Sequence, residues 1–151
     1  MKVCMLLYRK LWILLLLIVA LLGCDPNLSD DPIPYTAFPE IYINLALQVT
    51  LKTDGSYIYN NEGGYRGLII YRKNASSYLV YERNCSFHPN EACATVDVDV
   101  SGLFMRDPCC SSSFSFTDGT PIGGPAWRPL RRYVTILEGT DLYITDEIAT
   151  Q

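Results

Sequence analysis

The residues of this 151-residue chain that are best suited to chemistry are its six cysteines and its one histidine, His88. Four of the cysteines fall in the second half of the chain, at Cys85, Cys93, Cys109 and Cys110. In an oxidising compartment, four cysteines predict two disulfides, in one of three pairings. Thiols are also ligands for zinc and iron, with imidazole and carboxylate as common partners. Disulfide formation and metal binding are therefore the two chemistries to distinguish.

The other two cysteines belong to a segment typical of a bacterial lipoprotein signal peptide. Basic residues precede an unbroken apolar run, residues 11–22, and Gly23 and Cys24 follow it at once. This pattern predicts a signal peptide over residues 1–23, which removes Cys4 and leaves a lipidated Cys24 at the start of the mature chain. The run is short for a membrane span, which takes about 20 residues, and an uncleaved anchor helix is the alternative. Either way we expect a cell-envelope protein, anchored to a membrane with its domain outside the cytoplasm, in the periplasm or at the cell surface.

The charge of the mature chain limits its partners. The signal peptide contains three of the 12 basic residues and none of the 16 acidic ones, so its removal makes the chain more acidic. An acidic surface argues against a nucleic acid partner and gives no attraction to anionic lipid. We therefore expect the lipid anchor alone to attach the chain to the membrane.

The rest of the chain predicts one domain on a tether. Residues 24–39 are rich in proline and predict a flexible tether, and residues 40–151 are enough for one domain. Apolar runs rich in β-branched and aromatic residues alternate there with turn residues, which predicts an all-β domain. The runs cover residues 41–51, 57–59, 68–71, 78–81, 95–100, 114–116, 133–137 and 142–145.

Two local patterns add detail to this prediction. Glycine-containing turns at residues 53–56 and 138–141 are typical of hairpin connections. Val96, Val98 and Val100 alternate with two aspartates, which predicts valines in the core and aspartates in water.

Four segments between Tyr81 and Thr145 then follow the order of a known fold. Residues 81–89, Y-E-R-N-C-S-F-H-P, and residues 107–114, D-P-C-C-S-S-S-F, are similar to the two cluster loops of a Rieske domain. Residues 117–119 and 123–130 are similar to the glycine turn and the proline loop of that family. The resemblance implies a Rieske-like antiparallel β sandwich with a small two-loop metal-binding-type subdomain.

The residues at the ligand positions differ from the family pattern. A Rieske cluster contains two irons, one held by two cysteines and the other by two histidines. In this chain Asp107 stands at the second cysteine, Cys110 at the second histidine and Phe87 at the first histidine, while Cys85 keeps its place. Ser111 replaces the usual glycine, which predicts a strained backbone at a positive φ.

The first hypothesis for this site is that the cluster has been lost and the cysteines are structural. High-potential members of the family join their two loops by a disulfide, and the resemblance implies the same bond between Cys93 and Cys109. Cys85 and Cys110 would then face each other across the former cluster site. They could form a second disulfide only if the loops close so that their Cα atoms lie within about 7 Å.

Two further hypotheses keep a metal. In one, Cys85-x-x-His88 and Asp107-x-x-Cys110 close on a single zinc or iron ion, because a two-residue spacer lets both members of each pair reach it. In the other, a 2Fe-2S cluster persists with exchanged ligands and a lower potential than a Rieske centre.

The function expected from the sequence is that of a binding or structural component of the cell envelope, stabilised by disulfides, and not of a stand-alone enzyme. The alternative is an electron-transfer or metal-binding protein, with a 2Fe-2S cluster or a single Zn or Fe ion between the Cys85 and Cys110 loops. If the domain is redox-active, we expect an electron carrier or an oxidoreductase component. The expected partners are the membrane, through the anchor, and an envelope protein or a redox partner.

Overall fold

The computed structural model describes residues 31–150, so the predicted signal peptide and the lipidation site at Cys24 lie outside the described residues. Within this range the domain is all-β as expected, with ten strands and one short 3-10 helix, η1 (Thr50–Lys52). No helix of residues 31–150 is both long and apolar enough to cross a membrane.

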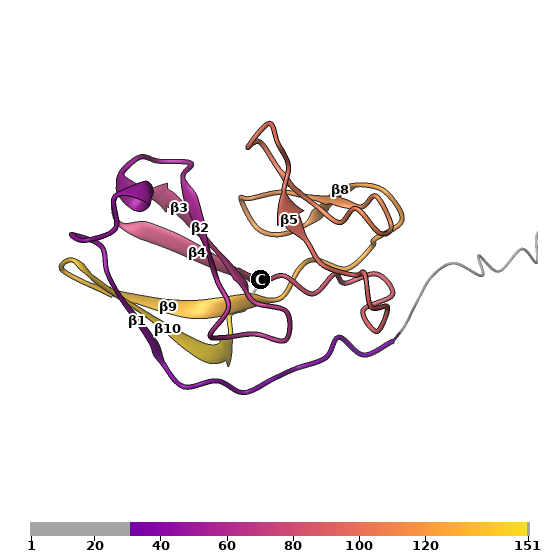
Figure 1. The fold of residues 1–151 in the computed structure, drawn as a ribbon, viewed down its shortest axis with the longest axis horizontal. Coiled ribbons are helices and arrows are strands. Elements are labelled where there is room, and N and C mark those ends of the chain that lie inside the picture. The colour runs from indigo at the N-terminus through magenta and orange to yellow at the C-terminus, as the bar shows by residue number, and fades with distance from the viewer. Residues whose placement is uncertain (1–30, 151) are drawn as a thin grey trace, which may run out of the picture.

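The larger of two sheets has six strands in the order β1-β10-β9-β4-β3-β2, and every neighbouring pair is antiparallel. Its strands are β1 (Ile41–Asn44), β2 (Tyr57–Asn60), β3 (Leu68–Asn74), β4 (Ser77–Glu82), β9 (Arg132–Glu138) and β10 (Asp141–Ile148). The sheet curls, so that β2 to β4 face β1, β9 and β10 (Figure 1). An apolar core fills the space between them, with Ile70 and Val80 from one side and Ile43 and Ile144 from the other.

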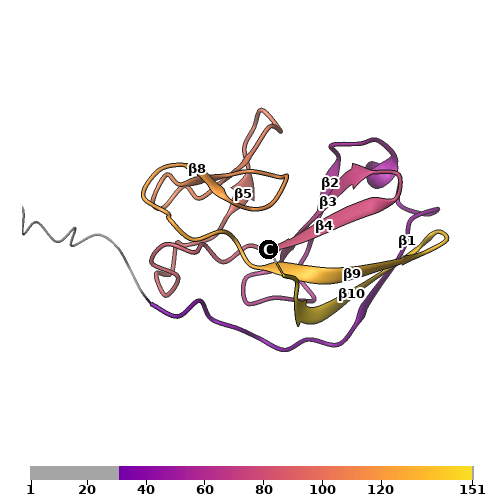
Figure 2. The ribbon, with the colours of Figure 1, turned by 180° about the vertical axis from the view of Figure 1, so that it is seen from behind.

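A smaller antiparallel sheet belongs to the second half of the chain. Its strands, in the order β5-β6-β7-β8, are β5 (Asp97–Val98), β6 (Met105–Arg106), β7 (Ser113–Phe114) and β8 (Pro121–Gly123). Successive side chains of a strand point to opposite faces, so Ile69 and Tyr81 of the large sheet point away from its core. They pack instead in a second apolar cluster with Met105 and Phe114. Figure 2 shows the small sheet set to one side of β2 to β4, where it forms a subdomain with the loops around it.

The predicted strand over residues 41–51 is only partly formed. β1 ends at Asn44, whose side-chain oxygen accepts a hydrogen bond from the amide of Ala46 and so turns the chain toward η1. The turn at 53–56 is not a hairpin connection, because β1 and β2 lie at opposite edges of the sheet. The prediction at 138–141 is confirmed, since β9 and β10 pair directly across that turn.

The alternation predicted for residues 96–100 is also wrong at its end. Val96 is buried and Val98 is half-buried, but Val100 is fully exposed. The reason is that the strand stops at Val98. Asp99 opens a turn in which its carbonyl accepts a hydrogen bond from the amide of Gly102 at 2.8 Å.

The described part of the predicted tether lies against the domain. Residues 31–40 contain no regular element, but Phe38 is buried in the first core. The Arg131 guanidinium donates to the carbonyl oxygen of Ile33 at 2.8 Å and to that of Pro34. In Figure 1 this segment is drawn in indigo and runs along the outside of the large sheet to β1. The sequence predicts a flexible tether over residues 24–39, whereas residues 33, 34 and 38 contact the domain.

Candidate metal centre

The first loop, residues 83–96, leaves the end of β4 and returns beside it. Its two ends are closed by an isolated antiparallel bridge between Asn84 and Thr95, and the amide of Cys85 donates to the carbonyl of Ala94 at 3.1 Å. This pairing places Cys85 in the second apolar cluster, where it is fully buried.

The second loop, residues 107–112, is a tight turn between β6 and β7. The amide of Asp107 donates to the carbonyl of Ser112, and the amide of Ser111 donates to the carbonyl of Asp107, both at 2.9 Å. One carboxylate oxygen of Asp107, Oδ1, accepts from the amide of Cys109 at 2.8 Å. Ser111 has a φ of 63°, so the positive φ predicted for the position of the family's glycine is present.

A disulfide between Cys93 and Cys109 joins the two loops. Their Cα atoms lie 5.5 Å apart and they are separated by 16 residues in the sequence. This is the pairing that the Rieske resemblance implied. In the chain-entropy model, closing a loop of this size stabilises the folded state by about 3 kcal/mol.

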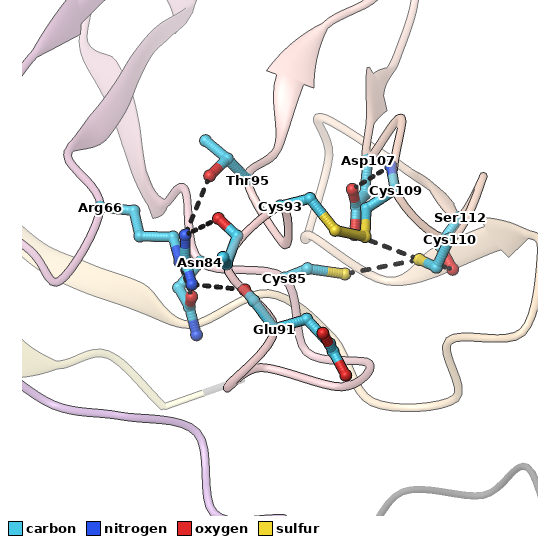
Figure 3. Close-up of a disulfide and its surroundings, with 11 residues drawn as sticks. Arg66, Asn84, Cys85, Glu91, Cys93, Thr95, Asp107, Cys109, Cys110 and Ser112 are labelled. Carbon is cyan, nitrogen blue, oxygen red and sulfur yellow. Dashed lines mark hydrogen bonds between the residues drawn. A yellow bond between two sulfur atoms is a disulfide. The ribbon is translucent and has the colours of Figure 1, made fainter.

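The other two cysteines of residues 31–150 are free thiols, and they meet between the loops (Figure 3). Cys85 Sγ lies 3.8 Å from Cys110 Sγ, and Cys110 Sγ lies 3.2 Å from Asp107 Oδ2. One ligand atom from each of the three residues lies within 4.8 Å of the other two. Cys85 and Asp107 are buried and Cys110 is half-buried. The two segments on which the functional hypotheses depended are therefore in contact.

The spacing of these atoms suits one tetrahedral ion. Two thiolates at about 2.3 Å from a tetrahedral zinc are roughly 3.8 Å apart, and a thiolate and a carboxylate oxygen are roughly 3.5 Å apart. The observed separations, 3.8 Å between the sulfurs and 3.2 Å between Cys110 Sγ and Asp107 Oδ2, are close to these values. Because Asp107 Oδ1 is used by the turn, Oδ2 is the oxygen that a metal would take.

His88 lies outside this group of ligand atoms, although it was predicted as the fourth ligand. Phe87, at the position of the family's first histidine, is buried, while His88 adopts a φ of 48° and its ring packs on that of Phe87, with centroids 4.2 Å apart. The structure thus brings together three of the four predicted ligands and leaves the imidazole outside the group.

A cavity of about 460 Å³ opens beside the thiols. Its wall contains two carboxylates, one imidazole and one free thiol, and none of the lining residues is Lys or Arg. It is lined by Phe87, His88, Glu91, Ala94, Asp107, Cys109, Cys110 and Pro125. Cys85 is not among them, so it lies behind Cys110 as seen from the cavity. Such a lining favours a cation over an anion.

Two electrostatic and hydrogen-bonding features complete the site. Burial, followed by the hydrogen bond to Asp107, raises the pKa of the Cys85 thiol well above its usual range.

Ser112, which was not predicted as a site residue, places its Oγ 3.0 Å from Cys110 Sγ and accepts a hydrogen bond from the amide of Ala126 at 3.0 Å. Its place in the family's Gly-Ser pair was the available signal. Glu91 also lines the cavity, and nothing in its sequence context indicated this.

No protein-family profile and no curated protein sequence matches this chain. Among solved structures it is similar to a chain in the complex of reduced oxygenase and oxidized ferredoxin in carbazole 1,9a-dioxygenase. The two are 18% identical, the match covers 74% of this chain and 98% of that chain, and the TM-score is 0.50. It is also similar to the ferredoxin of carbazole 1,9a-dioxygenase from Nocardioides aromaticivorans IC177, at 19% identity over 69% of this chain and 96% of that chain, with a TM-score of 0.46. The first likeness shows that the domain has the fold of a Rieske-type ferredoxin.

The residues present do not fit the cluster of that fold. A Rieske centre needs two imidazoles on one of its irons, and this chain has a single histidine, His88. The sulfurs of Cys85 and Cys110 lie 3.8 Å apart, a separation that one metal ion can bridge.

Proposed function

We propose that this chain is a lipid-anchored component of the cell envelope whose Rieske-fold domain binds a single zinc ion through Cys85, Asp107 and Cys110. The observation that carries the proposal is the convergence of three ligand atoms within 4.8 Å of one another at the junction of two loops. The signal-peptide pattern that ends at Cys24 supports the lipid anchor. The domain acts by binding and not as a stand-alone enzyme.

The chemistry of the three ligands favours zinc. Zinc accepts thiolate and carboxylate together, and tetrahedral zinc sites with three protein ligands leave a fourth position for water or another ligand. Asp107 and Cys110 line the cavity, so that position would open toward it. The disulfide between Cys93 and Cys109 holds the two loops together whether or not an ion is bound, and so keeps the ligands near one another.

The test is a zinc titration of the full chain, extracted from membranes in mild detergent under mild reduction and stripped with a chelator. Zinc content is measured by mass spectrometry of the metal, and affinity by competition with a chromogenic chelator. We expect one zinc per chain. Loss of a partner around a metal ligand typically weakens binding by about 10 to 100-fold, so the loss of a ligand itself in Cys85→Ser, Asp107→Asn or Cys110→Ser should cost at least about 100-fold.

Two variants serve as controls for this titration. Asp99→Asn removes a half-buried carboxylate of the same subdomain that does not belong to the group of three ligand atoms, and it should leave the affinity unchanged. His88→Ala removes a residue of the cavity wall outside the group of three ligand atoms, so it should weaken zinc binding less than any of the three ligand substitutions. Absence of stoichiometric zinc, or two irons with sulfide in the purified chain, would overturn the single-ion proposal.

The lipid anchor has its own test. In a bacterial host supplied with a labelled fatty acid, the full chain should incorporate label and fractionate with membranes. A Cys24→Ser variant should lose the label, whereas a Cys4→Ser variant should keep it. Labelling that survives Cys24→Ser would end this part of the proposal.

The ferredoxin fold favours electron transfer as a second candidate function. One of the similar solved structures is described as a ferredoxin in complex with an oxygenase. On this proposal an iron ion occupies the same three ligands, and the domain exchanges one electron with an envelope partner. The same purification decides between the two, because a bound iron has an absorption spectrum that changes with dithionite and zinc has none.

A further inference from the structure

We infer that Cys85 and Cys110 are a redox-active dithiol, which a small-molecule disulfide oxidises to a second disulfide between the two loops. The thiol chemistry depends only on the two sulfurs. Its consequence for metal binding rests on the proposed function, because the same sulfurs are two of the three proposed zinc ligands.

The two sulfurs are already in contact. They lie 3.8 Å apart, and a disulfide needs about 2.0 Å between them, so the sulfurs must approach each other by about 1.8 Å. The neighbouring bond between Cys93 and Cys109 already ties the first loop to the second. Cys109 and Cys110 are adjacent in the chain, so this bond also keeps Cys110 close to the first loop.

The two thiols differ in access, and this difference assigns their roles. Cys110 is half-buried and lines the cavity of about 460 Å³, whereas Cys85 is fully buried and does not line it. Thiol-disulfide exchange requires a thiolate to reach a sulfur of the incoming disulfide. Cys110 is therefore the attacking residue, and Cys85 is the resolving residue behind it.

The reaction consists of two exchanges. The Cys110 thiolate attacks one sulfur of the external disulfide, a bond forms between them, and the other half leaves as a thiolate. Cys85 then loses its proton as its sulfur attacks Cys110 Sγ, which forms the Cys85–Cys110 bond and releases the second half of the external disulfide as a thiolate. The two protons of the protein thiols end on the two released thiolates. The protein loses two electrons, and the external disulfide gains them and becomes two thiols.

Oxidation also removes the metal site. A disulfide sulfur is not a thiolate and does not bind zinc as one, so the new bond takes two of the three ligands away. Asp107 alone is left, and a single carboxylate does not hold zinc in a structural site. Zinc and the external disulfide thus compete for the same sulfurs, and the redox poise of the compartment sets whether the site holds an ion.

The experiment uses the full chain in detergent with its Cys93–Cys109 bond intact and glutathione disulfide as the probe. After acid quenching and alkylation, the protein is digested without reduction and the linked peptides are identified by mass spectrometry. Because Cys109 and Cys110 are adjacent, the linked peptides are fragmented to show which of the two cysteines is in the bond. In metal-free protein we expect a Cys85–Cys110 link to appear while the Cys93–Cys109 link persists. In zinc-loaded protein, one zinc should be released for each new link.

Two variants test the assignment of roles. Cys85→Ser should accumulate one glutathione on Cys110, because the resolving thiol is absent. In Cys110→Ser the remaining thiol is Cys85, which does not face the cavity. Glutathione should therefore modify it at least about tenfold more slowly than it modifies Cys110 in Cys85→Ser. Circular dichroism checks that both variants are folded, and the link in the unsubstituted chain is a readout that depends on neither.

The outcomes separate this inference from the proposed function. A chain that binds zinc but forms no Cys85–Cys110 link overturns the redox inference alone. A chain that forms the link but binds no zinc overturns the zinc proposal and leaves the dithiol chemistry in place. Faster modification of Cys85 than of Cys110 would overturn the assigned order of attack.

Discussion

Replacing Glu82 by Gln should destabilise the domain because the carboxylate of Glu82 is surrounded by donors. The side chain is fully buried at the end of β4. Its Oε2 accepts from the amide of Tyr65 at 2.7 Å and from the hydroxyl of Tyr133 at 2.9 Å. Its Oε1 accepts from the amides of Arg66 and Asn84, both at 3.0 Å. The side chain therefore joins three segments of the chain, one of which leads directly into Cys85.

The expected magnitude follows from counting these donors. In the Gln variant the side-chain amide nitrogen cannot accept a hydrogen bond. It is best placed where Oε2 lies in the parent, because the Tyr133 hydroxyl can rotate there and accept a hydrogen bond from it. The amide of Tyr65 then has no acceptor, which costs about 1–3 kcal/mol. The two bonds to the remaining oxygen lose their charge assistance, roughly half of their strength. We expect a total loss of about 3 kcal/mol in the free energy of unfolding.

The assay is urea unfolding of the full chain in detergent, without reductant, followed by circular dichroism. Tyr133→Phe removes one of the four donors and should cost about 1 kcal/mol. Glu62→Gln changes an exposed carboxylate and should stay within about 0.5 kcal/mol. If Glu82→Gln costs no more than Tyr133→Phe, the four contacts do not act as described and the reasoning is refuted.

Three further substitutions test other parts of the fold. Ser111→Gly should raise the free energy of unfolding by about 0.5–1 kcal/mol, because Ser111 has a φ of 63° and glycine adopts it without strain. Gly124→Ala should lower it by more than about 2 kcal/mol, because a Cβ there would lie 2.5 Å from the Cα of Ser112, at a φ of 82°. Arg131→Ala should speed limited proteolysis within residues 31–38 by at least about tenfold, because its guanidinium holds that segment.

Each of these expectations can fail in a specific way. Ser111→Gly and Gly124→Ala are measured in the same urea titrations. If Ser111→Gly is less stable than the parent, the contacts of the serine side chain stabilise the loop by more than its positive φ destabilises it. A neutral Gly124→Ala would show that the second loop can move away from residue 124. For Arg131→Ala, unchanged cleavage in residues 31–38 would mean that the burial of Phe38 and the hydrogen bonds of Asp31 and Tyr35 hold the segment without Arg131.

Much of the strand content could be predicted from local sequence. The runs at 68–71, 78–81, 133–137 and 142–145 are dense in β-branched and aromatic residues, and each lies within a strand. The run at 41–51 was predicted too long, because a single side-chain hydrogen bond from Asn44 turns the chain early. Such a bond competes with the sheet at one residue and leaves no trace in a hydrophobic pattern.

Local sequence patterns could not predict which strands pair with each other. β1 lies beside β10 and β2 lies beside β3, at opposite edges of the curled sheet, although a glycine-containing turn precedes β2. Pairing is decided by contacts between segments far apart in the chain, and a turn sequence does not report them. For the same reason the docking of residues 31–39 on Arg131 was not foreseen.

The sequence by itself determined the chemical inventory of the site: the loops of Cys85 and Cys110, the single histidine of the chain and the positive φ at Ser111. These are properties of residue identity and order. Only the tertiary structure decided that Cys85, Asp107 and Cys110 converge while His88 lies apart. The physical reason is that the distance between ligand atoms depends on how two loops pack and not on their spacing along the chain.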